Sequence, residues 1–337
     1  MNRKEIWENH QLASDFIAKK QLGNALDIFY EMVENASSDF YRHQLDKHKE
    51  TYTSILQHAF EDIEDPQRDD IYYRLLRDIL EVGDQLKEHL LTLSGGSSVY
   101  KTKGKIEQNI QEGKINYQHL LASLTKDTQL EDLLKDTNIT TQREEAQAED
   151  ERNEVLSDLF RVIWLIDKYG EAEEHLLHSI SESTVLPWHD KSLFVSSLTL
   201  SVLRCFDEKK IELLFDIYDK QEDQVWQRAL VGLLIALYKY DERVELYPKI
   251  LEKLDELKGD PELEKNIEAI IIQAIKSKET EEITRKWEQE ILPEIMKMRP
   301  NIEQKLDLEN IVSDKFLEDK NPDWERVFED SPDLLDK

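Results

Sequence analysis

The sequence predicts an all-α protein with no β-sheet, built as an α-solenoid: a right-handed superhelix of antiparallel helix pairs. Nine glycines and eight prolines in 337 residues are few, whereas strand-rich folds need many turns made of those residues. Apolar residues recur at helical spacing over most of the chain. A short junction motif also returns every 34–38 residues, which is the length of a helical-hairpin repeat.

The net charge of −29 restricts the function. Affinity for phosphate groups comes mostly from Lys and Arg. The charge therefore disfavours both general nucleic-acid binding and binding to anionic membrane surfaces. The main interpretation of this acidity is that it keeps the protein soluble, and the second is that it favours basic partners. Cys205 is the single cysteine, which excludes an internal disulfide. Neither a signal peptide nor a membrane-spanning run is recognisable, so we expect a cytoplasmic location.

Residues 1–125 are predicted to form an N-terminal helical region. It starts with a helix pair over residues 9–35, and two longer helices follow over 38–63 and 68–93. Proline after Asp65 ends the first of these, because the residue before proline resists the helical conformation. The Gly/Ser cluster at 94–98 lacks the Gly-Lys-Ser/Thr sequence of a phosphate loop and is interpreted as a turn.

The first helix pair resembles a tetratricopeptide repeat. The resemblance rests on an alternation of small and large apolar residues: Leu12, Ala13, Phe16, Leu22, Ala25, Phe29 and Met32. Two positions depart from the pattern, since Glu8 replaces the usual tryptophan and Lys20 the usual glycine of the loop. The resemblance implies two antiparallel helices that stack on a neighbouring pair.

Residues 126–152 are polar and acidic and are expected to be a linker or an exposed helix end. The repeated junctions follow: Ile166-x-x-Tyr169-Gly170-Glu171, Leu203-x-x-Phe206-Asp207-Glu208 and Leu237-x-x-Tyr240-Asp241-Glu242. The aliphatic and aromatic residues share one face and close the first helix against its neighbours. Gly or Asp then ends that helix or caps the next, and Glu complements the positive end of the second helix.

Residues 153–300 are therefore predicted to form four helix pairs resembling HEAT or tetratricopeptide repeats. The expected pairs are 153–169 with 172–181, 190–206 with 208–220, 223–240 with 242–258, and 260–278 with 280–298. Pro248 and Pro293 fall inside second helices, where we expect kinks. Residues 301–337 read as an acidic helical C-terminal segment. Because apolar residues close it without a polar capping repeat, we expect the protein to continue beyond Lys337.

No motif predicts a catalytic, cofactor or metal site. Phosphate loops, dinucleotide fingerprints and nucleophile elbows are not found, and His175 with His178 lacks a third metal ligand. The candidate functional residues are aromatic side chains that could anchor a protein partner, because aromatic residues dominate interface energetics. They are Trp188 and Trp324, which lie beside predicted turns, and less strongly Tyr72, Tyr73 and Tyr100. The alternative for each is an ordinary surface or core position.

The chain as a whole resembles the N-terminal part of large bacterial helical-repeat proteins, of the tetratricopeptide or HEAT-like type, whose function is undefined. This resemblance implies a non-enzymatic scaffold for protein–protein interaction that binds a protein or peptide, with basic partners favoured by the charge. Two alternatives stay open. One is a HEAT-like nucleic-acid enzyme of the base-excision type, which the net charge disfavours. The other is a module that positions a domain beyond Lys337.

Overall fold

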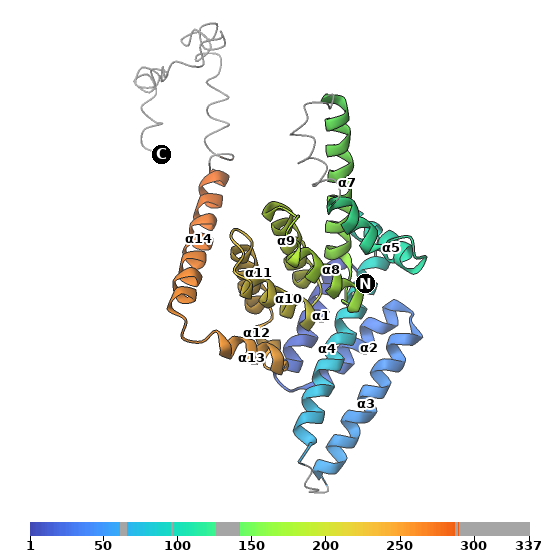
Figure 1. Cartoon of the computed structure of the whole chain (residues 1–337). Helices are drawn as coiled ribbons and strands as arrows, with labels where there is room; N and C mark the ends of the chain where they lie inside the picture. The colour runs from blue at the N-terminus through green and yellow to red at the C-terminus, as the bar shows by residue number, and fades with distance from the viewer. Residues whose placement is uncertain (61–65, 96, 126–141, 287–288, 290–337) are drawn as a thin grey trace, which may run out of the picture. The chain divides into compact units, whose positions relative to one another are not determined.

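The computed structural model of the chain describes residues 1–60, 66–95, 97–125, 142–286 and 289 (Figure 1). Within these ranges the regular secondary structure is helical and no β-strand occurs, which confirms the predicted all-α class. None of the described helices is both long enough and apolar enough to cross a membrane. The chain divides into two units, Met1–Gly259 and Asp260–Lys337, and each is described by itself.

Helices α1 (Arg3–Ala18) and α2 (Leu22–Ala36) form the expected N-terminal pair. A capping box starts α1: the amide of Glu5 donates to Asn2 Oδ1 at 3.0 Å, and the amide of Asn2 donates to Glu5 Oε2 at 2.8 Å. Most of the repeat-like apolar residues are buried: Ala13, Leu22, Ala25, Phe29 and Met32. Leu12 is an exception, because the buried face of α1 runs through its neighbour Ala13 and leaves Leu12 exposed.

Lys20 connects α1 to α2 with a backbone φ of 57°, in the left-handed region that favours glycine. The tetratricopeptide pattern has glycine at this position. Lys20→Gly is therefore expected to raise the free energy of unfolding by about 0.5–1 kcal/mol, measured by urea denaturation. Lys19, whose φ is −80°, provides the control. Lys19→Gly should destabilise the protein, and equal effects of the two substitutions would contradict the explanation.

Helix α4 (Arg68–Leu93) is the centre of the N-terminal bundle. It packs on α1, α2 and α3 (Asp39–Phe60). Gly83 of α4 permits close approach to α2, since an added Cβ would lie 2.3 Å from a ring atom of Phe29. Helix α5 (Ser98–Gln111) follows the Gly/Ser break and is capped by the Ser97 hydroxyl, which accepts from the amide of Val99 at 3.3 Å. Residues 117–125 are also helical.

The repeat region of the first unit places its helices in two rows. Helix α7 packs on α9, and α9 packs on α11; α10 contacts both α8 and α13. The bounds of these helices are α7 Gln142–Leu165, α8 Glu171–Glu182, α9 Trp188–Arg204, α10 Glu208–Asp219, α11 Trp226–Lys239, α12 Asp241–Val244 and α13 Pro248–Glu256. Residues 142–152 of the predicted linker or helix end belong to α7, and residues 126–141 lie outside the described ranges.

The junction motifs lie where the rows meet. Tyr169, Phe206 and Tyr240 are all buried, as their shared face requires. Asp207 caps α10 by accepting from the amide of Lys209 at 3.4 Å, and it also accepts from the amide of Tyr169 at 2.8 Å. One carboxylate therefore caps its own helix and links it to the preceding junction.

Two details of the predicted pairs are wrong. Pro248 does not kink a helix, because the chain breaks between α12 and α13 and Pro248 occupies the first position of α13, where its missing N–H costs nothing. In the second unit, α14 (Pro261–Lys286) runs through the break expected at residue 279. Neither an aromatic residue nor Gly or Asp stands at Lys278-Glu279, so nothing there ends a helix. Pro293 lies outside the described residues.

Candidate ligand-binding cleft

A cleft of about 260 Å³ lies in the first unit between α1, α4 and the turn from α11 to α12. Trp7 of α1 lies beside Lys87 of α4, and Lys20 lies beside Tyr73, so the two helices run antiparallel along the cleft. Trp7 and Ala18, near the two ends of α1, both line it and are separated by about 16 Å of helix at 1.5 Å per residue. The cleft is therefore elongated and follows the axis of α1.

Buried charges distinguish this cleft from two larger grooves of the first unit. Grooves of about 400 Å³ against α5 and about 480 Å³ along α3 are larger, but their charged lining side chains are all exposed. In the cleft, Lys87 and Arg243 are buried and still contribute to the lining. Removing a charge from water is costly unless the charge is paired, so such groups indicate either a structural network or a ligand.

The floor of the cleft is a buried network that joins α1, α4 and α12. Asp84 accepts from Arg243 at 2.7 and 3.3 Å and from His10 Nε2 at 2.8 Å. Arg243 also donates to the hydroxyl of Ser14 at 3.2 Å. Arg243 lies 159 residues from Asp84, so this contact fastens the repeat region to the N-terminal bundle. The Asp84–Arg243 pair is internally neutral and accounts for the buried charge of Arg243.

The network fixes the protonation of its members. Burial alone would raise the pKa of Asp84, but Arg243 and the hydrogen bond from His10 hold it well below its usual range. Burial, and then the positive charge of Lys87, lower the pKa of His10 to about 4. His10 is therefore neutral at pH 7 and donates its Nε2 proton to the carboxylate.

A second group of side chains lies at the Trp7 end of the cleft. The Trp7 ring is 42% exposed, with Lys87 Nζ at 4.7 Å and Lys239 Nζ at 6.0 Å from its centroid. Both ammonium groups also reach the C-terminal end of α9: Lys87 donates to the carbonyl of Arg204 at 3.2 Å, and Lys239 donates to the carbonyl of Leu203. The negative end of the α9 dipole thus helps to hold two cations at one indole.

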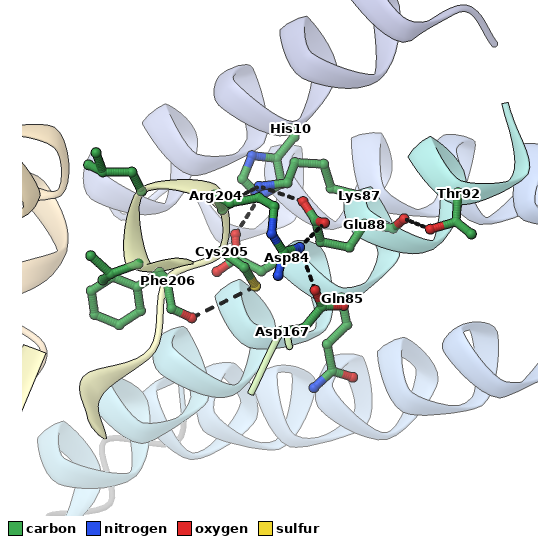
Figure 2. A network of polar contacts seen from close by, with 12 residues as sticks. His10, Asp84, Gln85, Lys87, Glu88, Thr92, Asp167, Arg204, Cys205 and Phe206 are labelled. Atoms are coloured by element: carbon green, nitrogen blue, oxygen red, sulfur yellow. Dashed lines mark hydrogen bonds and ion pairs between the residues drawn. The ribbon is translucent and has the colours of Figure 1, made fainter. Parts of the chain in front are cut away.

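Behind Lys87 lies a further ionic network, and Figure 2 shows its members Glu88, Asp167 and Arg204 together with His10 and Asp84 of the floor. Arg204 pairs with Glu88 and donates to Asp167 Oδ1 at 2.5 Å, and Lys103 donates to Asp167 Oδ2 at 2.6 Å. Burial would raise the pKa of Asp167, but Arg204 and Lys103 lower it. These contacts tie α4, α5 and α9 to the chain after α7.

The chain matches no protein-family model, and no curated protein or solved structure proves similar to it. The cleft is therefore interpreted from its own chemistry. It offers cationic donors, an indole ring and apolar walls. No group of three or more His, Cys, Asp or Glu side chains among the described residues could hold a metal ion. The Cys205 thiol is buried, and burial followed by the charge of Asp84 raises its pKa to about 12.

Of the aromatic residues predicted to bind a partner, the structure places one in the cleft. Tyr73 is 40% exposed there. Tyr72 and Tyr100 are partly buried against the N-terminal core, and Tyr100 has the Arg3 guanidinium over its ring at 5.3 Å. Trp188 is exposed at the start of α9 but does not line the cleft. Trp324 lies outside the described residues.

The residues that the sequence-based prediction missed are Trp7, Lys87, Lys239 and Arg243. Trp7 lies in a polar, charged stretch of the first helix, without a turn beside it. Lysines on helix surfaces are ordinary in a chain with 35% charged residues. The strongest signal in the sequence was the aromatic character of Trp7 itself, but this character does not distinguish a residue that lines a cleft from one on an ordinary surface.

Proposed function

We propose that the protein is a non-enzymatic scaffold for protein–protein interaction, in which stacked helix pairs continue as an α-solenoid, a right-handed superhelix. The arrangement of α7, α9 and α11 in one row and α8, α10 and α13 in another supports this proposal. Stacked pairs of this kind present extended surfaces to partners. The partner would be a protein or peptide, and basic residues would favour binding because the chain carries a charge of −29.

Contacts between successive pairs support the repeat interpretation. Lys210 donates to the carbonyl of Ile166 at 2.9 Å, and the hydroxyl of Tyr240 donates to the carbonyl of Val202 at 3.0 Å. In both cases a side chain from the next pair satisfies carbonyl groups at the end of a first helix, which otherwise lack partners. Each pair thus depends on the following one.

The observation that carries the proposal is the exposure of Trp7 and Tyr73 in one elongated cleft. Large aromatic side chains in a concave site contribute most to the binding free energy of protein interfaces. The exposed acidic residues of the turn that borders the cleft are Asp241, Glu242 and Glu245, and they suit basic side chains of a partner.

Photo-crosslinking tests this proposal. Tyr73 is replaced by p-benzoyl-L-phenylalanine in the full chain, and the protein is irradiated in a lysate of cells that naturally contain it. We expect one discrete crosslinked protein, identified by mass spectrometry, that excess unlabelled chain displaces. The matched control is the same replacement at Tyr238, which is 86% exposed on α11 outside the cleft. Identical products from both positions, or no displaceable product from Tyr73, would contradict the proposal.

A further inference from the structure

The two lysines beside Trp7 are incompletely paired. A lysine ammonium has three donors. Among the described residues, Lys239 Nζ donates only to the carbonyl of Leu203, and no carboxylate lies within 4.0 Å of it. Lys87 Nζ donates to the carbonyl of Arg204 and has Glu88 at 3.7 Å. Carbonyl groups cap the helix but do not neutralise a full positive charge.

Glu88 cannot neutralise Lys87 alone, because other cations share it. Lys103 Nζ lies 3.6 Å from the Glu88 carboxylate, and Arg204 contacts the same oxygen. The second carboxylate of this network, Asp167, is also shared between Lys103 and Arg204. A third carboxylate, Glu107, lies 3.5 Å from Lys103 Nζ, so three carboxylates balance the charges of Lys87, Lys103 and Arg204. Lys239 is the cation without a carboxylate partner among the described residues, and its charge makes the Trp7 end of the cleft positive, although the chain as a whole is strongly acidic.

The two ammonium groups also repel each other. Although the Lys239 side chain is exposed overall, partial burial of its ammonium group, and then the charge of Lys87, lower its pKa. Lys239 Nζ lies 6.0 Å from the Trp7 ring centroid and 5.2 Å from that of Tyr240, and an anion placed between the two ammonium groups would relieve their repulsion. The Trp7 ring accepts part of this charge on its face, but cation–π attraction is weaker than a charge-assisted hydrogen bond.

We propose that Lys87 and Lys239 bind an anionic group, a carboxylate or a phosphate, against the Trp7 indole. Each ammonium directs its remaining donors to the anion while its carbonyl contact holds it in place. The cleft volume of about 260 Å³ equals that of about nine water molecules at roughly 30 Å³ each, so it accepts a small anion or one residue of a larger ligand. The site does not require the protein partner proposed above.

The test uses the full chain labelled with 5-fluorotryptophan, with the Trp7 signal assigned from a Trp7→Phe variant. Acetate, inorganic phosphate and a short blocked peptide with one glutamate are titrated at constant ionic strength and followed by ¹⁹F NMR. We expect a saturable shift of the Trp7 signal with at least one of the three. Acetamide, the neutral analogue of acetate, should produce none. The response to the free anions or to the peptide identifies the source of the anionic group.

Lys239→Met is expected to weaken this binding at least about tenfold, because charge-assisted hydrogen bonds are lost. Lys239 is an exposed residue, so the variant should fold, and its melting temperature checks this. The matched control is Lys20→Met, which removes the same charge from the other end of the cleft. Binding that is unchanged in Lys239→Met, equally weakened in Lys20→Met, or not detectable with any of the three anions would overturn the inference.

Discussion

Asp84→Asn is expected to lower the free energy of unfolding by about 3–5 kcal/mol, measured by urea denaturation with circular dichroism. Asp84 is buried and accepts hydrogen bonds from both Arg243 and His10. Asparagine keeps the shape of the side chain but removes its charge. The guanidinium of Arg243 then remains buried without an anion, and the desolvation of that unpaired charge is the main cost.

Glu81→Gln is the control for this prediction. Glu81 lies on the same helix and is 3.4 Å from Lys168 Nζ, but its side chain is 47% exposed, so its removal should cost less than about 0.5 kcal/mol. A variant that combines Asp84→Asn with Arg243→Met should be more stable than Asp84→Asn alone, because no buried charge is left unpaired. A cost for Asp84→Asn no larger than that for Glu81→Gln would show that the network does not stabilise the fold.

The part of the fold that depends on local spacing could be predicted from the sequence. The helix over residues 68–93 was predicted with the bounds of α4, because its apolar positions recur at helical spacing and a proline precedes it. The junction residues Tyr169, Phe206 and Tyr240 were predicted to be buried, because each follows an aliphatic residue by three positions and shares its helix face. The prediction failed for α14, where a period of 38 residues was extended to a segment without the junction residues.

The cleft could not be predicted, because it forms only when distant segments meet. Trp7, Lys87 and Lys239 come from three helices, and each is unremarkable within its own helix. The order of the helix pairs does not reveal that Arg243 of α12 lies against Asp84 of α4, to which it donates at 2.7 Å. Position beside a turn favoured Trp188, which lies outside the cleft, whereas Tyr73, inside a predicted helix, was only a weaker candidate.

Acidification should weaken the fold through His10. The pKa of His10 is lowered from 6.5 to about 4 by burial and then by Lys87, whereas in the unfolded chain it returns to about 6.5. Between pH 6.5 and about 4 the unfolded state binds a proton at His10 that the folded state does not bind, so the free energy of unfolding falls as the pH falls. The contribution of neutral His10 to the free energy of unfolding is complete above pH 6.5 and is lost towards pH 4. The loss amounts to about 3 kcal/mol, at 1.36 kcal/mol per pKa unit.

His10→Asn isolates this contribution, since asparagine can still donate to Asp84 but does not titrate. Free energies of unfolding measured from pH 7.5 to 4 should fall less steeply in this variant than in the parent protein, by up to about 3 kcal/mol over the range. Burial also lowers the pKa of His48 and His89, so the difference between the two proteins, and not the parent slope alone, reports on His10. If His10→Asn kept the full slope of the parent, His10 would bind its proton equally well in the folded and the unfolded protein, and burial would not lower its pKa.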